Sequence, residues 1–123
     1  MSIRELHQQI IDALEQGDFV GPIEKFYAED VVVQSNDDPP ATGRDAIAAA
    51  ERKYVEGVTA FHGIKVHATA VDDQGEGSGV VFYECEMHWE HTDRPKVDIN
   101  QTVVERWKNG KIASIRFYGD IHL

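Results

Sequence analysis

A strict alternation of side-chain character over residues 81–90 is the feature that most limits how this chain can fold. A period of two residues places successive side chains on opposite faces of a β-strand, and no helix produces it. The even positions are mostly charged, so the odd positions must face the protein interior. The inward set is Val81, Tyr83, Cys85, Met87 and Trp89, and the outward set is Phe82, Glu84, Glu86, His88 and Glu90.

The rest of the chain divides into an N-terminal helical part and a C-terminal part rich in strands. Apolar residues first recur at helical spacing, and from residue 61 onward the period changes to that of strands. We therefore predict one α+β domain over residues 1–123, in which a meandering antiparallel sheet curls around three N-terminal helices with one face inward. The predicted helices lie near residues 3–14, 19–27 and 42–54, and the predicted strands near 31–33, 61–70, 81–90, 97–107 and 111–121.

Composition and charge argue against several classes of function. A net charge of −10 would repel nucleic acid and anionic membranes, so we expect neither as a partner. Cys85 is the single cysteine, which excludes an internal disulfide and a CxxC metal site. His88 and His91 would face opposite sides of a strand, so we expect no metal at this pair. We also expect no organic cofactor. We find no signal peptide and no membrane-spanning run, and we expect a cytoplasmic protein.

The KNGK turn decides which face the final strand turns inward. A two-residue Asn-Gly turn would pair Trp107 with Ile112 and direct an arginine and an aspartate toward the core. A three-residue turn with Gly110 in the left-handed conformation would direct apolar residues inward instead, and we favour it on burial grounds. The two inward sets are Arg116, Tyr118 and Asp120 for the first turn, and Ile115, Phe117 and Ile121 for the second.

Polar side chains on the inward faces define the candidate site, because such groups are either hydrogen-bonded or line a cavity. Burial would suit Glu105 to general acid/base work, and His62, in register with Ile64, could move protons near neutral pH. The alternatives are that Glu105 reaches water at the sheet end and that His62 is structural. Cys85 is favoured as a small core residue. The expected ligand-contacting residues are Tyr27, Ser35, Tyr83, Cys85, Met87, Gln101, Val103 and Phe117.

Three phrases, together with the order of the elements, resemble a known family. The phrases are FYAEDVVVQSNDDPPATGRDAI, FHG with VHATAV, and QTVVERWKNGKIASIRFYGD. They resemble the SnoaL-like branch of the nuclear transport factor 2-like superfamily over essentially the whole chain. The resemblance implies a cone-shaped, cystatin-like roll, in which a curved antiparallel or mixed sheet wraps around the three helices. Its pocket would take a small, largely apolar molecule. It also implies a homodimer formed through the outer face of the sheet.

The resemblance leaves the activity open, because the superfamily contains ketosteroid isomerases, polyketide cyclases, epoxide-hydrolase-like enzymes and non-enzymatic binding proteins. Aligned through FYAEDVVVQS, the isomerase base falls on Ser35, its oxyanion-hole acid on Val103 and its oxyanion tyrosine on or near Ile10. A chain without those groups cannot use that mechanism. Two hypotheses remain. The first is an isomerase, cyclase or hydratase in which Glu105 or His62 moves the proton, and the second is a non-catalytic ligand-binding or accessory protein.

Overall fold

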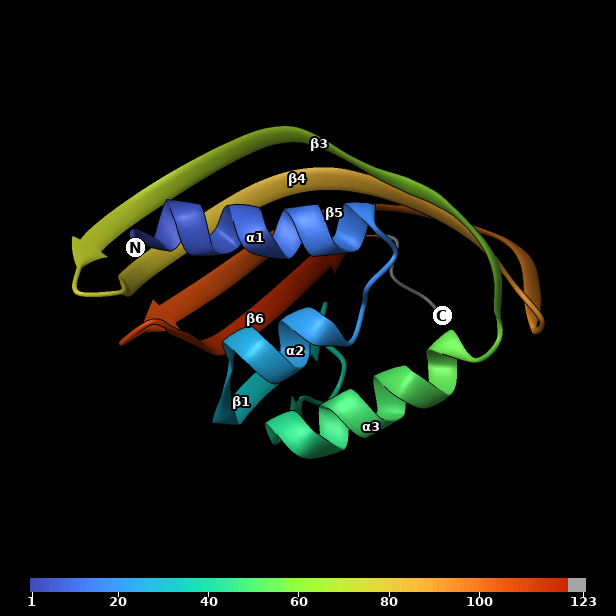
Figure 1. Ribbon diagram of the computed structural model, residues 1–123, viewed down its shortest axis with the longest axis horizontal. Helices are drawn as coiled ribbons and strands as arrows, with labels where there is room; N and C mark the ends of the chain where they lie inside the picture. Colours follow the sequence, from blue (N-terminus) through green and yellow to red (C-terminus); the bar gives the residue numbers. More distant parts are fainter. Residues whose placement is uncertain (120–123) are drawn as a thin grey trace.

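The computed structural model describes residues 1–119, which form one mixed sheet with three helices (Figure 1). The strands follow the order β2-β1-β6-β5-β4-β3 across an open sheet. Strands β3 to β6 form the expected antiparallel meander, whereas β1 pairs with β6 in parallel. The helices are α1 (Ile3–Glu15), α2 (Gly21–Phe26) and α3 (Arg44–Val55), and the strands are β1 (Tyr27–Ser35), β2 (Ala41–Thr42), β3 (Val58–Gly75), β4 (Ser78–His91), β5 (Arg94–Lys108) and β6 (Lys111–Gly119).

Helix α1 lies along the inner side of the curved strands β3 and β4 and contacts both of them (Figure 1). A capping box starts it: the Glu5 amide donates to the Ser2 hydroxyl at 3.2 Å, and the Ser2 amide donates to the Glu5 carboxylate at 3.0 Å. Its buried stripe recurs at helical spacing, and one member of that stripe is polar. The buried residues are Ile3, His7, Ile10 and Ile11.

The alternation predicted for residues 81–90 is confirmed, since the odd positions of β4 are buried and the even positions are more exposed. Strand β5 alternates in the same phase, and the two inner faces match residue for residue. Tyr83 pairs with Val103 and Cys85 pairs with Gln101. This pairing aligns polar and aromatic side chains from neighbouring strands on the inner face of the sheet.

The final strand reaches the predicted register by a different route from the one expected. The turn has two residues, Asn109 and Gly110, both with positive φ, and Trp107 pairs with Ile112. A bulge directly before Trp107 then shifts the pairing by one residue, so that Glu105 lies opposite Ile115. The expected three-residue turn is therefore wrong, while the inward position of Ile115 is confirmed.

The outward residues of β6 also follow from this bulge. Arg116 donates to the backbone oxygen of Asn36 at 3.0 Å, and Tyr118 is 42% exposed. The bulge therefore places them away from the inward-facing Ile115 and Phe117. Asp120 and Ile121, which were assigned to opposite faces, lie outside the described residues.

Candidate functional site

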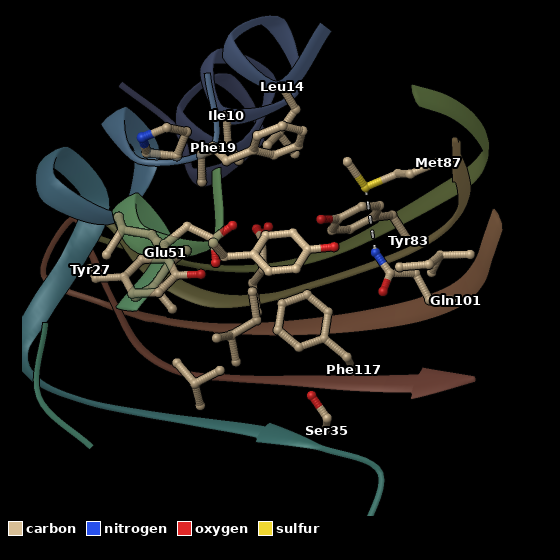
Figure 2. Close-up of a pocket in the computed structure, with 18 of the residues that line it drawn as sticks. Ile10, Leu14, Phe19, Tyr27, Ser35, Glu51, Tyr83, Met87, Gln101 and Phe117 are labelled. Carbon is tan, nitrogen blue, oxygen red and sulfur yellow. Dashed lines mark hydrogen bonds between the residues drawn. The ribbon is translucent and has the colours of Figure 1, made fainter. Parts of the chain in front are cut away.

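A cavity of about 280 Å³ lies between the inner face of the sheet and the helices (Figure 2). Its walls are mostly apolar and aromatic, with a small number of polar groups, which is the usual composition of a small-molecule site. Every helix contributes, as do β1, β4, β5 and β6. The lining residues are Ile10, Leu14, Phe19, Pro22, Ile23, Tyr27, Val33, Ser35, Glu51, Tyr54, Tyr83, Met87, Trp89, Ile99, Gln101, Glu105, Ile112, Ile115 and Phe117.

The most deeply buried polar group of the cavity is the carboxyl of Glu105, on β5. Its residue is fully buried, and its Oε1 lies 2.9 Å from Nδ1 of His7 and 3.1 Å from Nε1 of Trp107. The indole N–H can only donate, so Oε1 is an accepting oxygen and we assign the proton of the first bond to His7 Nδ1. The second oxygen, Oε2, is buried and has no hydrogen-bond partner among the described residues.

Two tyrosines lie within the electrostatic influence of Glu105. Burial, followed by the nearby Glu105, raises the pKa of Tyr83 far above its usual value, and the same causes in the same order raise the pKa of Tyr27. The ring of Tyr83 also packs against that of His7, with centroids 4.7 Å apart. Both phenols therefore stay protonated at neutral pH and can donate hydrogen bonds to a ligand oxygen.

A second carboxyl, that of Glu51, reaches the cavity from helix α3. Figure 2 shows Glu51 beside Tyr27, on the opposite side of the view from Met87 and Gln101. Burial raises the pKa of Glu51, and this carboxyl makes no hydrogen bond or ion pair within residues 1–119. Sequence reasoning missed it, because an isolated glutamate in the segment AAAERKY is typical of a solvated helix face.

The structure brings most of the predicted site residues together at this cavity. Glu105 lines it, together with the expected ligand contacts Tyr27, Ser35, Tyr83, Met87, Gln101 and Phe117. Cys85 and Val103 face the same side of the sheet but are not lining residues. Gln101 packs over Cys85, with its Nε2 3.6 Å from the sulfur, and Val103 is fully buried. The roles of the lining residues in binding stay predictions.

The expected inward position of His62 is wrong. A register shift lies between Phe61 and Ile64 in β3, and Gly63 adopts a φ of +106° there. Phe61 consequently takes the inward position, and His62 is exposed with its Nε2 2.7 Å from Glu90. The histidine that reaches the carboxylate is His7, whose sequence signal was its place in the buried stripe of α1, four residues after Ile3.

Comparison with known families shows which family the chain belongs to. The model of the SnoaL-like domain matches residues 7–115, which is nearly the full length. The chain belongs to the SnoaL-like domain family. No curated protein matches it significantly in sequence, so this membership rests on the match to the domain model.

Solved structures share the fold of this SnoaL-like domain at low sequence identity. An epoxide hydrolase of the LEH-like type from M. tuberculosis is 19% identical, with a TM-score of 0.76, and the match covers 97% of this chain and 83% of that one. A protein described as a SnoaL-like polyketide cyclase, from Jannaschia sp., is 13% identical with a TM-score of 0.75, and the match covers 97% of this chain and 85% of that one. A ketosteroid isomerase-like protein from Erwinia carotovora is 15% identical with a TM-score of 0.71, covering 98% and 95%. These likenesses establish the fold alone.

The SnoaL-like cavity carries an unbalanced set of charges. Two carboxyls line it, and no lysine, arginine or histidine is found among the described lining residues. Within residues 1–119 no group of three or more His, Cys, Asp or Glu side chains is arranged to hold a metal ion, and none of the helices is long and apolar enough to cross a membrane. The two carboxyls and the tyrosine hydroxyls of the lining can transfer protons and form hydrogen bonds in a mostly apolar enclosure.

Proposed function

We propose that this SnoaL-like domain is a cofactor-independent enzyme of the isomerase, cyclase or hydratase type, acting on a small, largely apolar molecule by acid/base chemistry. One observation carries the proposal: a fully buried glutamate lines the cavity with one oxygen held in place and the other without a partner. An unsatisfied buried acceptor costs free energy in the resting protein, and a substrate proton or an enclosed water would satisfy it. Glu105 is therefore the proposed proton-transfer group.

The residues around Glu105 have separable proposed roles. His7 and Trp107 fix the carboxylate by holding Oε1, which leaves Oε2 as the reacting oxygen. The hydroxyls of Tyr27 and Tyr83 would donate to the substrate oxygen on which negative charge develops. His62, which faces away from the cavity, has no part in this proposal.

The test is proton exchange in deuterium oxide. A panel of small cyclic ketones and enones is incubated with the protein, and deuterium uptake beside the carbonyl is followed by NMR. The expected result is acceleration of exchange for at least one compound, with a loss of about 100-fold or more in Glu105→Gln. His62→Gln, which changes an outward-facing residue, serves as the matched control and keeps the rate. Unchanged exchange in Glu105→Gln would contradict the assignment.

A second candidate function is non-catalytic binding of a small apolar ligand. It is favoured by the residue at position 35, where the resemblance to isomerases places a catalytic base and this chain has Ser35. In that case compounds of the panel bind without turnover, and Glu105→Gln retains their affinity. Binding measured by ligand-observed NMR, alongside the exchange assay, separates the two candidates.

We further propose that the domain works as a cytoplasmic homodimer through the outer face of the sheet. Support comes from Phe82 on β4 and Tyr118 on β6, which are outward-facing and 40% and 42% exposed. Burial of such side chains favours association. Light scattering after size exclusion, compared between the parent and Phe82→Ser, tests the dimer, and a monomeric parent contradicts it.

A further inference from the structure

Beyond the proposed proton transfer, the cavity has a charge preference that points to a class of ligand. Its described lining contains two carboxyls and no cationic side chain. Glu51 approaches from α3 and Glu105 from β5, and the hydroxyl group of Tyr27 interacts electrostatically with both. The fully buried Oε2 of Glu105 has no protein partner, which independently indicates a place for a ligand.

We infer that the ligand of this cavity is an apolar amine in its cationic form, with its ammonium group held at Glu51 and its apolar body against the aromatic walls. The inference deepens the proposed function and rests on it, because it names the substrate class of the same cavity. The ammonium end lies at the α3 side, and the rest of the substrate, including the oxygen that accepts from the tyrosines in the proposed function, lies toward Glu105, whose Oε2 stays available for proton transfer.

Hydrogen-bonding capacity favours an ammonium over other polar groups. Glu51 is an acceptor without a partner among the described residues, and an ammonium supplies three N–H donors and no acceptor. A ketone supplies no donor from its oxygen, and an alcohol supplies one. A ligand carboxylate would face two protein carboxyls without a cation on the lining to offset the repulsion.

Electrostatics point in the same direction. Burial raises the pKa of Glu51, and no cationic side chain among the described lining residues offsets the loss of water around its ionised form. A cation at this position would offset that loss, and the attraction between the two charges is stronger beside the mostly apolar cavity walls than in bulk water. The net charge of −10 also attracts cations to the protein before they bind.

The cavity walls suit both parts of such a ligand. Six aromatic residues line the cavity, and a cation over an aromatic face is attracted by the ring. Trp89 is central to this wall: its indole N–H donates to the Tyr54 hydroxyl at 2.9 Å, and its ring centroid lies 6.0 Å from that of Phe19. The aromatic set is Phe19, Tyr27, Tyr54, Tyr83, Trp89 and Phe117.

The test compares three probes with one carbon skeleton: phenylpropylamine, phenylpropanol and phenylpropanoate. Calorimetric titration of the full chain measures their affinities at neutral pH and low salt. We expect the amine to bind about tenfold more tightly than the alcohol, because its ammonium forms an ion pair with the carboxylate, whereas the hydroxyl donates to it without a charge of its own. The carboxylate should bind most weakly of the three.

Variants on α3 assign the charge preference to one residue. Glu51→Gln should reduce the amine affinity to that of the alcohol and leave the alcohol affinity unchanged, which also demonstrates that the cavity is intact. Glu56→Gln removes the same charge from an exposed position at the end of the same helix and should leave the amine preference intact. An equal loss in both variants would overturn the assignment to Glu51.

The outcomes distinguish this inference from the proposed function. Alcohol binding as tight as amine binding would overturn the amine class while leaving the small-molecule cavity in place. Failure of all three probes at millimolar concentration would contradict the amine class and also the proposal that the cavity takes small apolar molecules.

Discussion

Replacing His7 with leucine should destabilise the protein strongly, because it removes one partner of a buried polar pair. The His7 side chain is 3% exposed and that of Glu105 is 1% exposed. Loss of one partner from a buried pair costs about 3–5 kcal/mol. The Trp107 indole still donates to Glu105 in this variant, so we expect a value near the lower limit, about 3 kcal/mol.

Urea unfolding followed by tryptophan fluorescence measures this loss. With a dependence on urea of about 2 kcal/mol/M, a loss of about 3 kcal/mol lowers the midpoint by about 1.5 M. Glu105→Gln is the matched control, since an amide oxygen can still accept from both neighbours, and it should cost only about 1 kcal/mol. The double variant His7→Leu/Glu105→Leu should cost about 2 kcal/mol, well below the sum of His7→Leu and Glu105→Leu alone, because of this set only the Trp107 indole N–H is then left buried without a partner.

The double-mutant cycle measures the coupling free energy between His7 and Glu105. We expect the double variant to be more stable than the sum of its single variants by about 3 kcal/mol. Additive losses, or a cost for His7→Leu below about 1 kcal/mol, would mean that the imidazole does not compensate the buried carboxyl. His7 would then lose its proposed role in holding Glu105 for proton transfer.

Two further predictions concern the sheet outside the cavity. Gly79→Ala should lower the free energy of unfolding in urea by more than 2 kcal/mol, because Gly79 has a φ of +142° and the added Cβ would collide with the backbone oxygen of Asp72. Gly63→Ala is the control: its φ is +106° but the added Cβ meets no atom, so it should cost about 1 kcal/mol. Equal costs would contradict the steric cause. Hydrogen bonds to Asp98 and then to Glu86 raise the pKa of His88 in the folded protein. Protonated His88 therefore stabilises the folded state fully below the unfolded pKa of about 6.5, and this contribution is lost as the pH rises through the pKa of the folded state. The thermal midpoint of His88→Asn should therefore fall further below that of the parent at pH 6 than at pH 9, and a deficit independent of pH would refute this.

Much of the cavity could be predicted because its strands obey a strict rule. In β4 and β5 the side chains alternate without interruption between the bulges, so the sequence alone placed Tyr83, Gln101 and Glu105 on the inner face. The helical contribution was harder to predict. His7 belongs to the buried stripe of α1 and had a detectable signal, whereas Glu51 reaches the cavity only because of how α3 packs in three dimensions.

Bulges explain the remaining errors, and their positions follow from competition between side chains for burial. In β3 an unbroken alternation through Ile64 would bury His62 and expose Phe61. The bulge instead lets Phe61 pack edge-on against Phe19 at 5.1 Å and pair with Trp89. Full burial of a phenylalanine stabilises by about 1.5–3 kcal/mol, of which the partly buried Phe61 gains a share, while burial of a polar group without a partner costs about 1–3 kcal/mol. Both terms favour the bulge, and Gly63 accommodates the backbone at the shift without strain from a side chain. The same reasoning applies to β6, where a bulge after a tight turn buries both Ile112 and Ile115. A period-two pattern therefore predicts the face of a strand only up to the next position at which an extra residue improves the packing.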